Sequence, residues 1–212
     1  MTLGGSTEAT KSTETSSSSA PKTYDMMMLL DDYYNNAKYY ITLNKQGYVE
    51  YAYEELEGAF FDEMEITEWY FKYNNAGQLT EFTESTKGYE DNVTTLSYNS
   101  AGDLTTIIDT LWDSKEEISY TDEKTPTPIP NKSGIILLED CYKISTQYSS
   151  LNYMAMAGLL GKSSTHLPII LILGDGYYTQ RNNWTLDASD MPISFYYDYK
   201  DVTSVRGCPV IC

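Results

Sequence analysis

The chain has 212 residues, and its 14 Lys and Arg residues against 31 Asp and Glu residues give a net charge of −17. This balance disfavours nucleic acid and anionic membrane surfaces as partners, because both are bound mainly through clustered basic side chains. No stretch approaches the roughly 18 consecutive apolar residues of a membrane helix.

The first segment, residues 1–23, is rich in Ser, Thr and Gly and has almost no large apolar side chains. It contains no apolar core of a secretory signal, so in an exported protein we expect the signal to have been removed already. We predict a disordered Ser/Thr-rich tether over 1–23, or simply a disordered terminus, because such a segment buries too little surface to offset its ordering entropy. A single antiparallel β domain is predicted over 24–212, in which residues 24–38 fit either a helix or a strand.

The body of the chain repeats a hairpin unit. Residues 73–82 (YNNAGQLTEF) and 98–107 (YNSAGDLTTI) agree in identity or type at seven of ten positions. Weaker copies occupy residues 43–52 and 186–195. The first two copies stand about 25 residues apart, a spacing that fits two strands with their turns.

The chemistry of the unit predicts a bulged turn. Asn or Asp opens a type I turn by bonding to its own backbone two residues on, and Gly three positions later closes the hairpin in the left-handed conformation. In the last copy Asp190 replaces the glycine, and aspartate tolerates this conformation better than most residues. With a one-residue bulge at each turn, Tyr73 would oppose Leu79 and Tyr98 would oppose Leu104.

Strand alternation in front of the first turn predicts two distinct faces. One face would carry Thr67, Trp69, Phe71 and Tyr73, and the other Ile66, Glu68, Tyr70 and Lys72. Tyrosine, with 21 copies, suits such a surface because its ring packs while its hydroxyl stays hydrated.

Further elements follow in chain order. Additional strands are predicted at 39–43, 48–53, 93–98, 117–121, 169–173 and 193–199, with a hairpin turn at 174–176. Residues 122–134 hold three prolines and are predicted to be a linker or a long crossing loop. Apolar residues at helical spacing predict one short helix near 149–161 that is ended by Gly161. The fold class is therefore all-β, a single curved antiparallel sheet or an open barrel of tandem hairpins.

These hairpin units resemble the tyrosine/aspartate repeats of bacterial cell-surface proteins. Together with residues 158–168 (GLLGKSSTHLP), they are similar to a family of exported Bacteroidetes lipoproteins with a porin-like domain of unknown function. The resemblance covers most of residues 35–200. It implies an outer-membrane or cell-surface lipoprotein precursor, membrane contact only through a lipid anchor that this chain lacks, and no catalytic residues to transfer.

Residues that typically build metal or cofactor sites are few. Cys141, Cys208 and Cys212 allow at most one intramolecular disulfide, either Cys208–Cys212 or Cys141–Cys208. Their spacing is not that of a zinc site, even with His166 added. The acidic residues near turns, Asp175, Asp187 and Asp190, do not have the spacing of a calcium loop. We therefore expect no metal and no cofactor.

Nucleophilic and nucleotide chemistry is also disfavoured. His166 is the only histidine, and its partner would have to be Ser163, Ser164 or Cys141. No serine lies in a Gly-x-Ser-x-Gly elbow, so a structural histidine is the favoured interpretation. The segment GLLGKS has two rather than four residues between its glycines, which argues against a phosphate-binding loop.

Two kinds of side chain remain as candidates for function. Neighbouring carboxylates could form the two-carboxylate site of a glycan hydrolase, although a solvated acidic face is favoured; they are Glu54/Glu55, Asp62/Glu63/Glu65, Glu116/Glu117 and Asp187/Asp190. Aromatic side chains on the open face of a sheet could bind ligands, although a role only in the core and in cross-strand pairs is favoured. The candidates of this second kind are Trp69, Tyr70, Trp112 and Trp184.

The favoured function is an exported, surface-anchored, non-catalytic binding or structural module, with glycan or protein ligands held by exposed aromatic side chains. A related alternative is adhesin-like protein recognition through the edges of the sheet. The alternative from another class is a glycan-active hydrolase that uses paired carboxylates.

Overall fold

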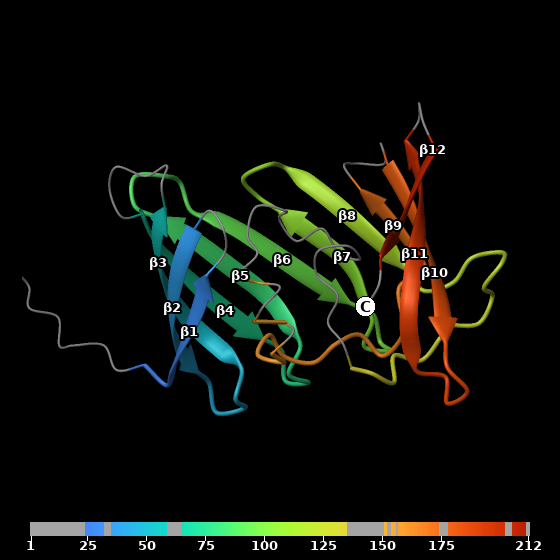
Figure 1. Ribbon diagram of the computed structural model, residues 1–212, viewed down its shortest axis with the longest axis horizontal. Coiled ribbons are helices and arrows are strands. Elements are labelled where there is room, and N and C mark those ends of the chain that lie inside the picture. The colour runs from blue at the N-terminus through green and yellow to red at the C-terminus, as the bar shows by residue number, and fades with distance from the viewer. Residues whose placement is uncertain are drawn as a thin grey trace, which may run out of the picture.

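The computed structural model describes residues 24–31, 35–58, 65–134, 151, 154–155, 157–173, 178–201 and 205–210. Twelve strands in these residues form one antiparallel sheet, in which each strand pairs with its neighbours in the sequence (Figure 1). The strands are β1 (Met26–Asp31), β2 (Asn35–Leu43), β3 (Val49–Gly58), β4 (Glu65–Tyr73), β5 (Leu79–Thr86), β6 (Asn92–Tyr98), β7 (Leu104–Asp109), β8 (Ser114–Ser119), β9 (Ile170–Leu173), β10 (Tyr178–Leu186), β11 (Pro192–Asp201) and β12 (Val205–Val210). The predicted all-β fold is confirmed as a curved sheet whose edges are β1 and β12.

The turns of the hairpin unit have the predicted chemistry. Gly77 has φ +85 and donates its backbone N–H to the carbonyl of Asn74 at 2.9 Å. Gly102, with the same φ, donates to Asn99 at 3.0 Å. Asp190 takes the place of the glycine in the last copy at φ 60. Each turn therefore depends on one residue that adopts the left-handed conformation.

The predicted register is confirmed as well. Tyr73 opposes Leu79 and Tyr98 opposes Leu104, and the ladder shifts by one residue just before each pair. The alternation in β4 follows from this register: one face is buried, and the other carries exposed or half-exposed side chains. We call the buried face of the sheet the inner face and the opposite one the outer face.

Three tyrosines in the middle of the sheet each form a hydrogen bond to the preceding hairpin. The Tyr73 hydroxyl donates to the carbonyl of Val49 at 2.8 Å, and the Tyr98 hydroxyl donates to that of Leu79 at 2.8 Å. One hairpin later, the Tyr120 hydroxyl donates in the same way to the carbonyl of Leu104 at 2.9 Å. Val49 and Leu79 are each the first residue of a strand that leaves a repeat turn. Phenylalanine could fill the same space but could not make this bond, which explains why the repeat uses tyrosine.

These links predict a loss of stability in alkali. Burial raises the pKa of Tyr73 and of Tyr98 well above the ordinary tyrosine value, and neighbouring tyrosines add to the shift. A raised pKa in the folded state means that the stabilisation is complete below the unfolded pKa of about 10 and is lost as pH rises through the folded value. In urea titrations across this range, Tyr73→Phe/Tyr98→Phe should lose less stability than the original protein. Each replacement should cost about 1 kcal/mol at neutral pH.

The control for this experiment is Tyr89→Phe, which alters a tyrosine that is 76% exposed in the turn after β5. This variant should keep the pH dependence of the original protein. Identical alkaline slopes for the double variant and the original protein would contradict the role given to the two buried hydroxyls.

Residues 157–169, which we call the floor segment, cross the inner face at the end where the repeat turns lie (Figure 1). The N–H of Lys162 donates to the carbonyl of Gly77 at 2.8 Å. The Thr165 hydroxyl donates to the carbonyl of Ala101 at 2.8 Å. The floor segment thus fastens turns from successive repeats together, and its apolar side chains complete the core. The buried core residues include Ile41, Trp69, Phe71, Phe82, Leu96, Leu104, Ile107, Ile118, Met154, Leu160, Leu167 and Leu171.

The predicted helix is present as helical conformation at the described residues between 151 and 155. It is followed by Gly158 at φ +72, three residues before its predicted end. Gly161 instead forms an isolated β-bridge with Gln78, which directly follows the turn at residues 74–77. The reason is tertiary: the chain needs this glycine where its backbone meets another turn.

The remaining predicted elements agree with the structure where it describes them. The ambiguous region at 24–38 contains β1 and the start of β2. Residues 122–134 form a crossing loop, whose start is held by an ion pair from Arg181 Nε to Asp122 Oδ2 at 2.6 Å. The turn predicted at 174–176 lies outside the described residues, as do Cys141 and Cys212. Among the described residues, no helix is long and apolar enough to span a membrane.

Candidate ligand-binding face

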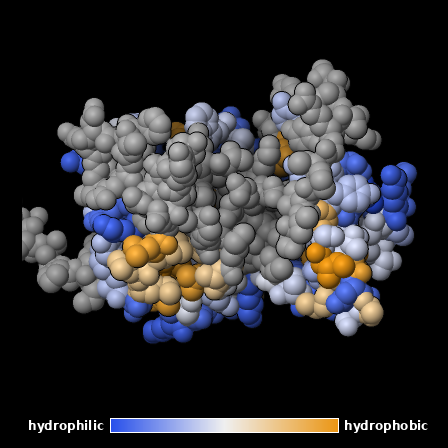
Figure 2. All heavy atoms as spheres, in the orientation of Figure 1, coloured by the Kyte–Doolittle hydropathy of each residue, from blue (hydrophilic) through white to orange (hydrophobic). Residues whose placement is uncertain are grey.

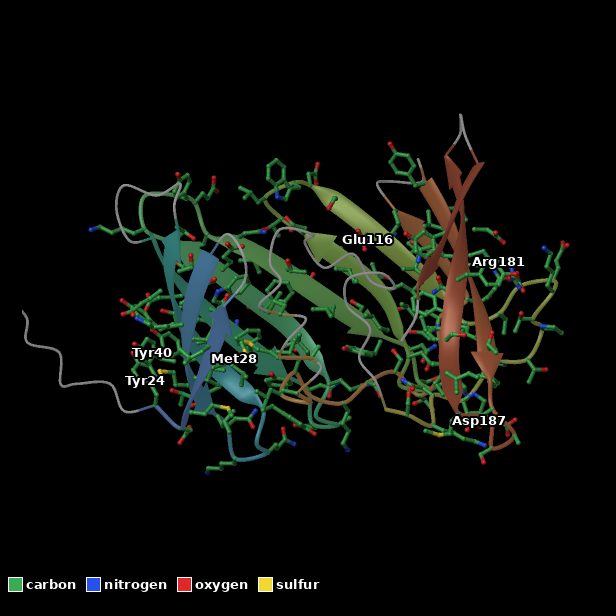
Figure 3. All side chains as sticks on the ribbon, in the orientation of Figure 1. Tyr24, Met28, Tyr40, Glu116, Arg181 and Asp187 are labelled. Carbon is green, nitrogen blue, oxygen red and sulfur yellow. The ribbon has the colours of Figure 1, made fainter. Side chains whose placement is uncertain are left out.

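Four tyrosines lie on the outer face of β2, β3 and β4, and a fifth, Tyr24, lies just before β1. Tyr40 opposes Tyr53 across β2 and β3, and Tyr51 opposes Tyr70 across β3 and β4. The ring centroids of these pairs are 6.0 and 5.3 Å apart, and Tyr24 lies 5.2 Å from Tyr40. Figure 3 shows Tyr24 and Tyr40 side by side next to β1 and β2. We call these five residues the tyrosine patch.

The patch follows from period-two alternation combined with register. Tyr51 and Tyr53 are two residues apart in β3 and therefore share a face. The intervening Ala52 is fully buried on the inner face. The bulged turn at residues 44–47 fixes the register that places Tyr40 opposite Tyr53. A slip of one residue in this hairpin would bury these rings or expose the core.

Two carboxylates lie within the patch and accept hydrogen bonds from three of its hydroxyl groups. Glu68 accepts from the Tyr51 hydroxyl at 2.6 Å and from the Tyr70 hydroxyl at 3.1 Å, one bond at each carboxylate oxygen. Glu55 accepts from the Tyr40 hydroxyl at 3.3 Å. These bonds hold the rings in place and direct their polar ends toward negative charge.

The charged side chains in and around the patch include both carboxylates and lysines. Burial raises the pKa of Tyr53, and the carboxylate of Glu55 is the next largest cause. Lys38 stands opposite Glu55 in the β2–β3 register. Lys72, further along the outer face of β4, is paired with Glu81 of β5.

Exposed apolar side chains extend the patch to the edge of the sheet. Met27 opposes Tyr40, and Leu29 opposes Lys38, so both side chains lie on the outer face of β1. They are 55% and 63% exposed, respectively. Figure 2 shows hydrophobic atoms gathered at this β1 edge of the molecule.

The structure does not bring together the four aromatic residues singled out from the sequence. Only Tyr70 belongs to the tyrosine patch. Trp69, the next residue, is 0% exposed and donates its Nε1–H to Glu54 on the inner face at 3.1 Å. Trp112 is 69% exposed in the turn between β7 and β8. Trp184 lies half-buried on β10, where its ring contacts the buried core.

Sequence reasoning missed four members of the patch: Tyr24, Tyr40, Tyr51 and Tyr53. A signal was available, because Tyr51 and Tyr53 alternate along one strand and the 44–47 turn places Tyr40 beside them. The sequence did not place Tyr24 in the same way, because the pattern of residues 24–38 fits either a helix or a strand.

The neighbouring carboxylates are largely separated by the alternation of the strands. Glu54 is buried and accepts from Trp69, whereas Glu55 lies on the outer face in the patch. Glu116 and Glu117 likewise lie on opposite faces of β8. Two carboxylates on opposite faces of one sheet cannot flank the same glycosidic bond.

The other acidic candidates have local roles or lie outside the described residues. Asp187 Oδ1 accepts the backbone N–H groups of Ser189 and Met191 at 2.7 and 2.9 Å, and these bonds lower the pKa of its carboxyl group. Asp62 and Glu63 are not among the described residues. Among those that are, no group of three or more His, Cys, Asp or Glu side chains could hold a metal ion.

Ser164 fastens the floor segment to β7, and His166 fastens it to Asp103, the residue just before β7. The backbone N–H of His166 donates to Asp103 Oδ1 at 2.9 Å, and its Nδ1 lies 2.9 Å from Asp103 Oδ2. Ser164 Oγ accepts the N–H of Leu104 at 3.0 Å and lies 2.9 Å from the Tyr120 hydroxyl. Both side chains are therefore engaged in structure, which supports the interpretation of His166 as a structural histidine.

Comparison with known proteins finds only distant structural similarity. No protein-family model and no curated protein matches the chain. A crystal structure described as a porin-like protein from Bacteroides uniformis is similar at 18% sequence identity and a TM-score of 0.40. The match covers 89% of this chain and 96% of the other. At this identity and TM-score the similarity carries no argument about the function of this chain.

Proposed function

We propose that this chain is a non-catalytic binding module of the bacterial cell surface, which holds a ligand on the tyrosine patch. The observation that carries the proposal is the grouping of five tyrosines at the outer face of the first four strands, in which three ring pairs have centroids 5.2 to 6.0 Å apart. Tyrosine favours binding surfaces because it offers a large, rigid contact area at a low cost in conformational entropy.

The architecture suits a platform rather than a cleft. Paired strands fix the ring positions before any ligand arrives, so little ordering is needed on binding. The carboxylates of Glu55 and Glu68 restrain three of the hydroxyls. The same strands carry the core on their inner face, which makes the platform rigid.

Export and surface anchoring form the second part of the proposal, and they rest on the resemblance of residues 35–200 to exported lipoproteins. The test is fractionation of cells that produce the full-length precursor, followed by protease treatment of intact cells. Cleavage by external protease would support a surface location. Recovery in the cytoplasmic fraction would contradict it.

The binding test compares the original protein with a Tyr51→Ala/Tyr70→Ala variant on glycan and peptide arrays. A ligand that stacks on two rings should be bound at least about tenfold more weakly by the variant, because each aromatic contact contributes about 1 kcal/mol. Tyr89→Ala removes a tyrosine that is 76% exposed elsewhere and should leave binding unchanged. Equal ligand binding by the original protein and the patch variant would refute the proposal.

The same glycans should be assayed for release of reducing sugar. Binding without turnover is the expected result. Turnover that is abolished by a single Glu→Gln replacement would instead establish the hydrolase alternative.

A further inference from the structure

The ligand class can be inferred from the polar groups that the tyrosine patch presents, and this inference rests on the proposed function. Three hydroxyl groups donate hydrogen bonds to carboxylates. The Tyr40 hydroxyl donates to Glu55, and the Tyr51 and Tyr70 hydroxyls donate to Glu68. A tyrosine hydroxyl has only one proton to donate. A ligand arriving at these three residues therefore meets oxygen acceptors and ring faces.

We propose that the patch binds a basic polypeptide segment through its arginine side chains. A guanidinium group has five N–H donors and no acceptor, so it complements a surface of acceptors. Its plane also stacks on tyrosine rings, where the cation is attracted by the negative face of the π-system. Both contacts are available at the Tyr51–Tyr70 pair, whose rings flank the shared carboxylate of Glu68.

The surroundings support a cationic partner. The chain carries a net charge of −17, which attracts basic segments over a distance. Lys72 is paired with Glu81, and Lys38 is opposed by Glu55, so each lysine near the patch faces a carboxylate. The exposed Met27 and Leu29 lie beside the patch on β1, where they can contact the aliphatic stems of basic side chains.

A neutral glycan fits these groups less well. Sugar hydroxyls both donate and accept hydrogen bonds, so a glycan needs donors from its site as well as acceptors. Three of the five hydroxyls in the patch are already directed onto Glu55 and Glu68. A glycan bound at Tyr40, Tyr51 and Tyr70 would have to break those bonds or leave some of its own acceptors unpaired.

The experiment measures binding of the full chain to a labelled peptide of alternating glycine and arginine by fluorescence anisotropy. The matched ligand replaces each arginine with citrulline, which keeps the shape and removes the charge. We expect the citrulline peptide to bind at least about tenfold more weakly, and higher salt to weaken the arginine peptide. Glu68→Gln and, separately, Glu55→Gln should weaken arginine-peptide binding by about three- to tenfold.

The matched control is Glu123→Gln, which makes the same charge change at an exposed site in the crossing loop and should alter binding by less than about twofold. Unfolding midpoints measured in parallel identify any variant that fails to fold. Equal binding of the two peptides, or equal effects of Glu68→Gln and Glu123→Gln, would overturn the inference.

The outcomes also separate this inference from the proposed function. Binding of an uncharged oligosaccharide that depends on Tyr51 and Tyr70 but not on Glu68 would leave the binding module intact and refute the basic partner. Binding of every ligand independently of these tyrosines would refute both.

Discussion

Replacing Gly161 with alanine should lower the free energy of unfolding by more than about 3 kcal/mol, a larger loss than at most surface positions. A Cβ at this position would lie 2.6 Å from the backbone oxygen of Gly77 and 2.9 Å from the Tyr73 ring. The backbone oxygen of Gly77 cannot move without displacing the turn at residues 74–77. Gly161 also has φ +89, so an L side chain would be strained there even without the clash.

The control for Gly161→Ala is Gly158→Ala in the same segment. Gly158 has φ +72, but an added Cβ would meet nothing within 4 Å. Only backbone strain should remain, at a cost of about 1 kcal/mol. Urea unfolding followed by circular dichroism measures both values. Equal losses at the two glycines would show that the close approach of Gly161 to the turn does not support the fold.

Replacing Trp69 with alanine should destabilise the protein by about 3–5 kcal/mol, the range typical of a large aromatic residue lost from a core. The side chain is 0% exposed. Its removal would leave a cavity beside Phe82, whose ring centroid is 6.2 Å away. It would also take the Nε1 donor from the buried carboxylate of Glu54, which accepts from the Tyr39 hydroxyl as well, at 2.7 Å.

Two further tryptophan variants make this prediction specific. Trp69→Phe keeps most of the ring volume and loses the Nε1 bond, so it should cost less than Trp69→Ala. Trp112→Ala removes a ring that is 69% exposed and should change stability by no more than about 0.5 kcal/mol. Comparable losses for Trp69→Ala and Trp112→Ala would contradict the burial assigned to Trp69.

The local structure of this protein was predictable because its determinants lie within short stretches of sequence. An Asn or Asp followed three residues later by a residue that accepts the left-handed conformation is sufficient to specify the bulged turn. These turns then fix the pairing of Tyr73 with Leu79 and of Tyr98 with Leu104. Alternation then assigned Trp69 and Tyr70 to opposite faces, although the sequence did not say which of those faces would be solvated.

The candidate site was only partly predictable, for the same reason. Tyr70 was identified, but the other members of the patch come from β2, β3 and the residues just before β1. Ring contacts between strands depend on a register that extends through several hairpins. A buried tryptophan and an exposed one look alike in sequence. Trp69 and Trp112 are told apart by what the neighbouring strands and the floor segment cover.

The sequence by itself determined the all-β class, the turns, the hairpin register and the acidic charge, because each follows from composition or from residues a few positions apart. Only the tertiary structure decided the path of the floor segment, the bonds from Tyr73 and Tyr98 to preceding hairpins, and the grouping of five tyrosines on one face. These features join residues distant in the sequence, and their physical basis is close packing and cross-strand contact, which no local pattern records.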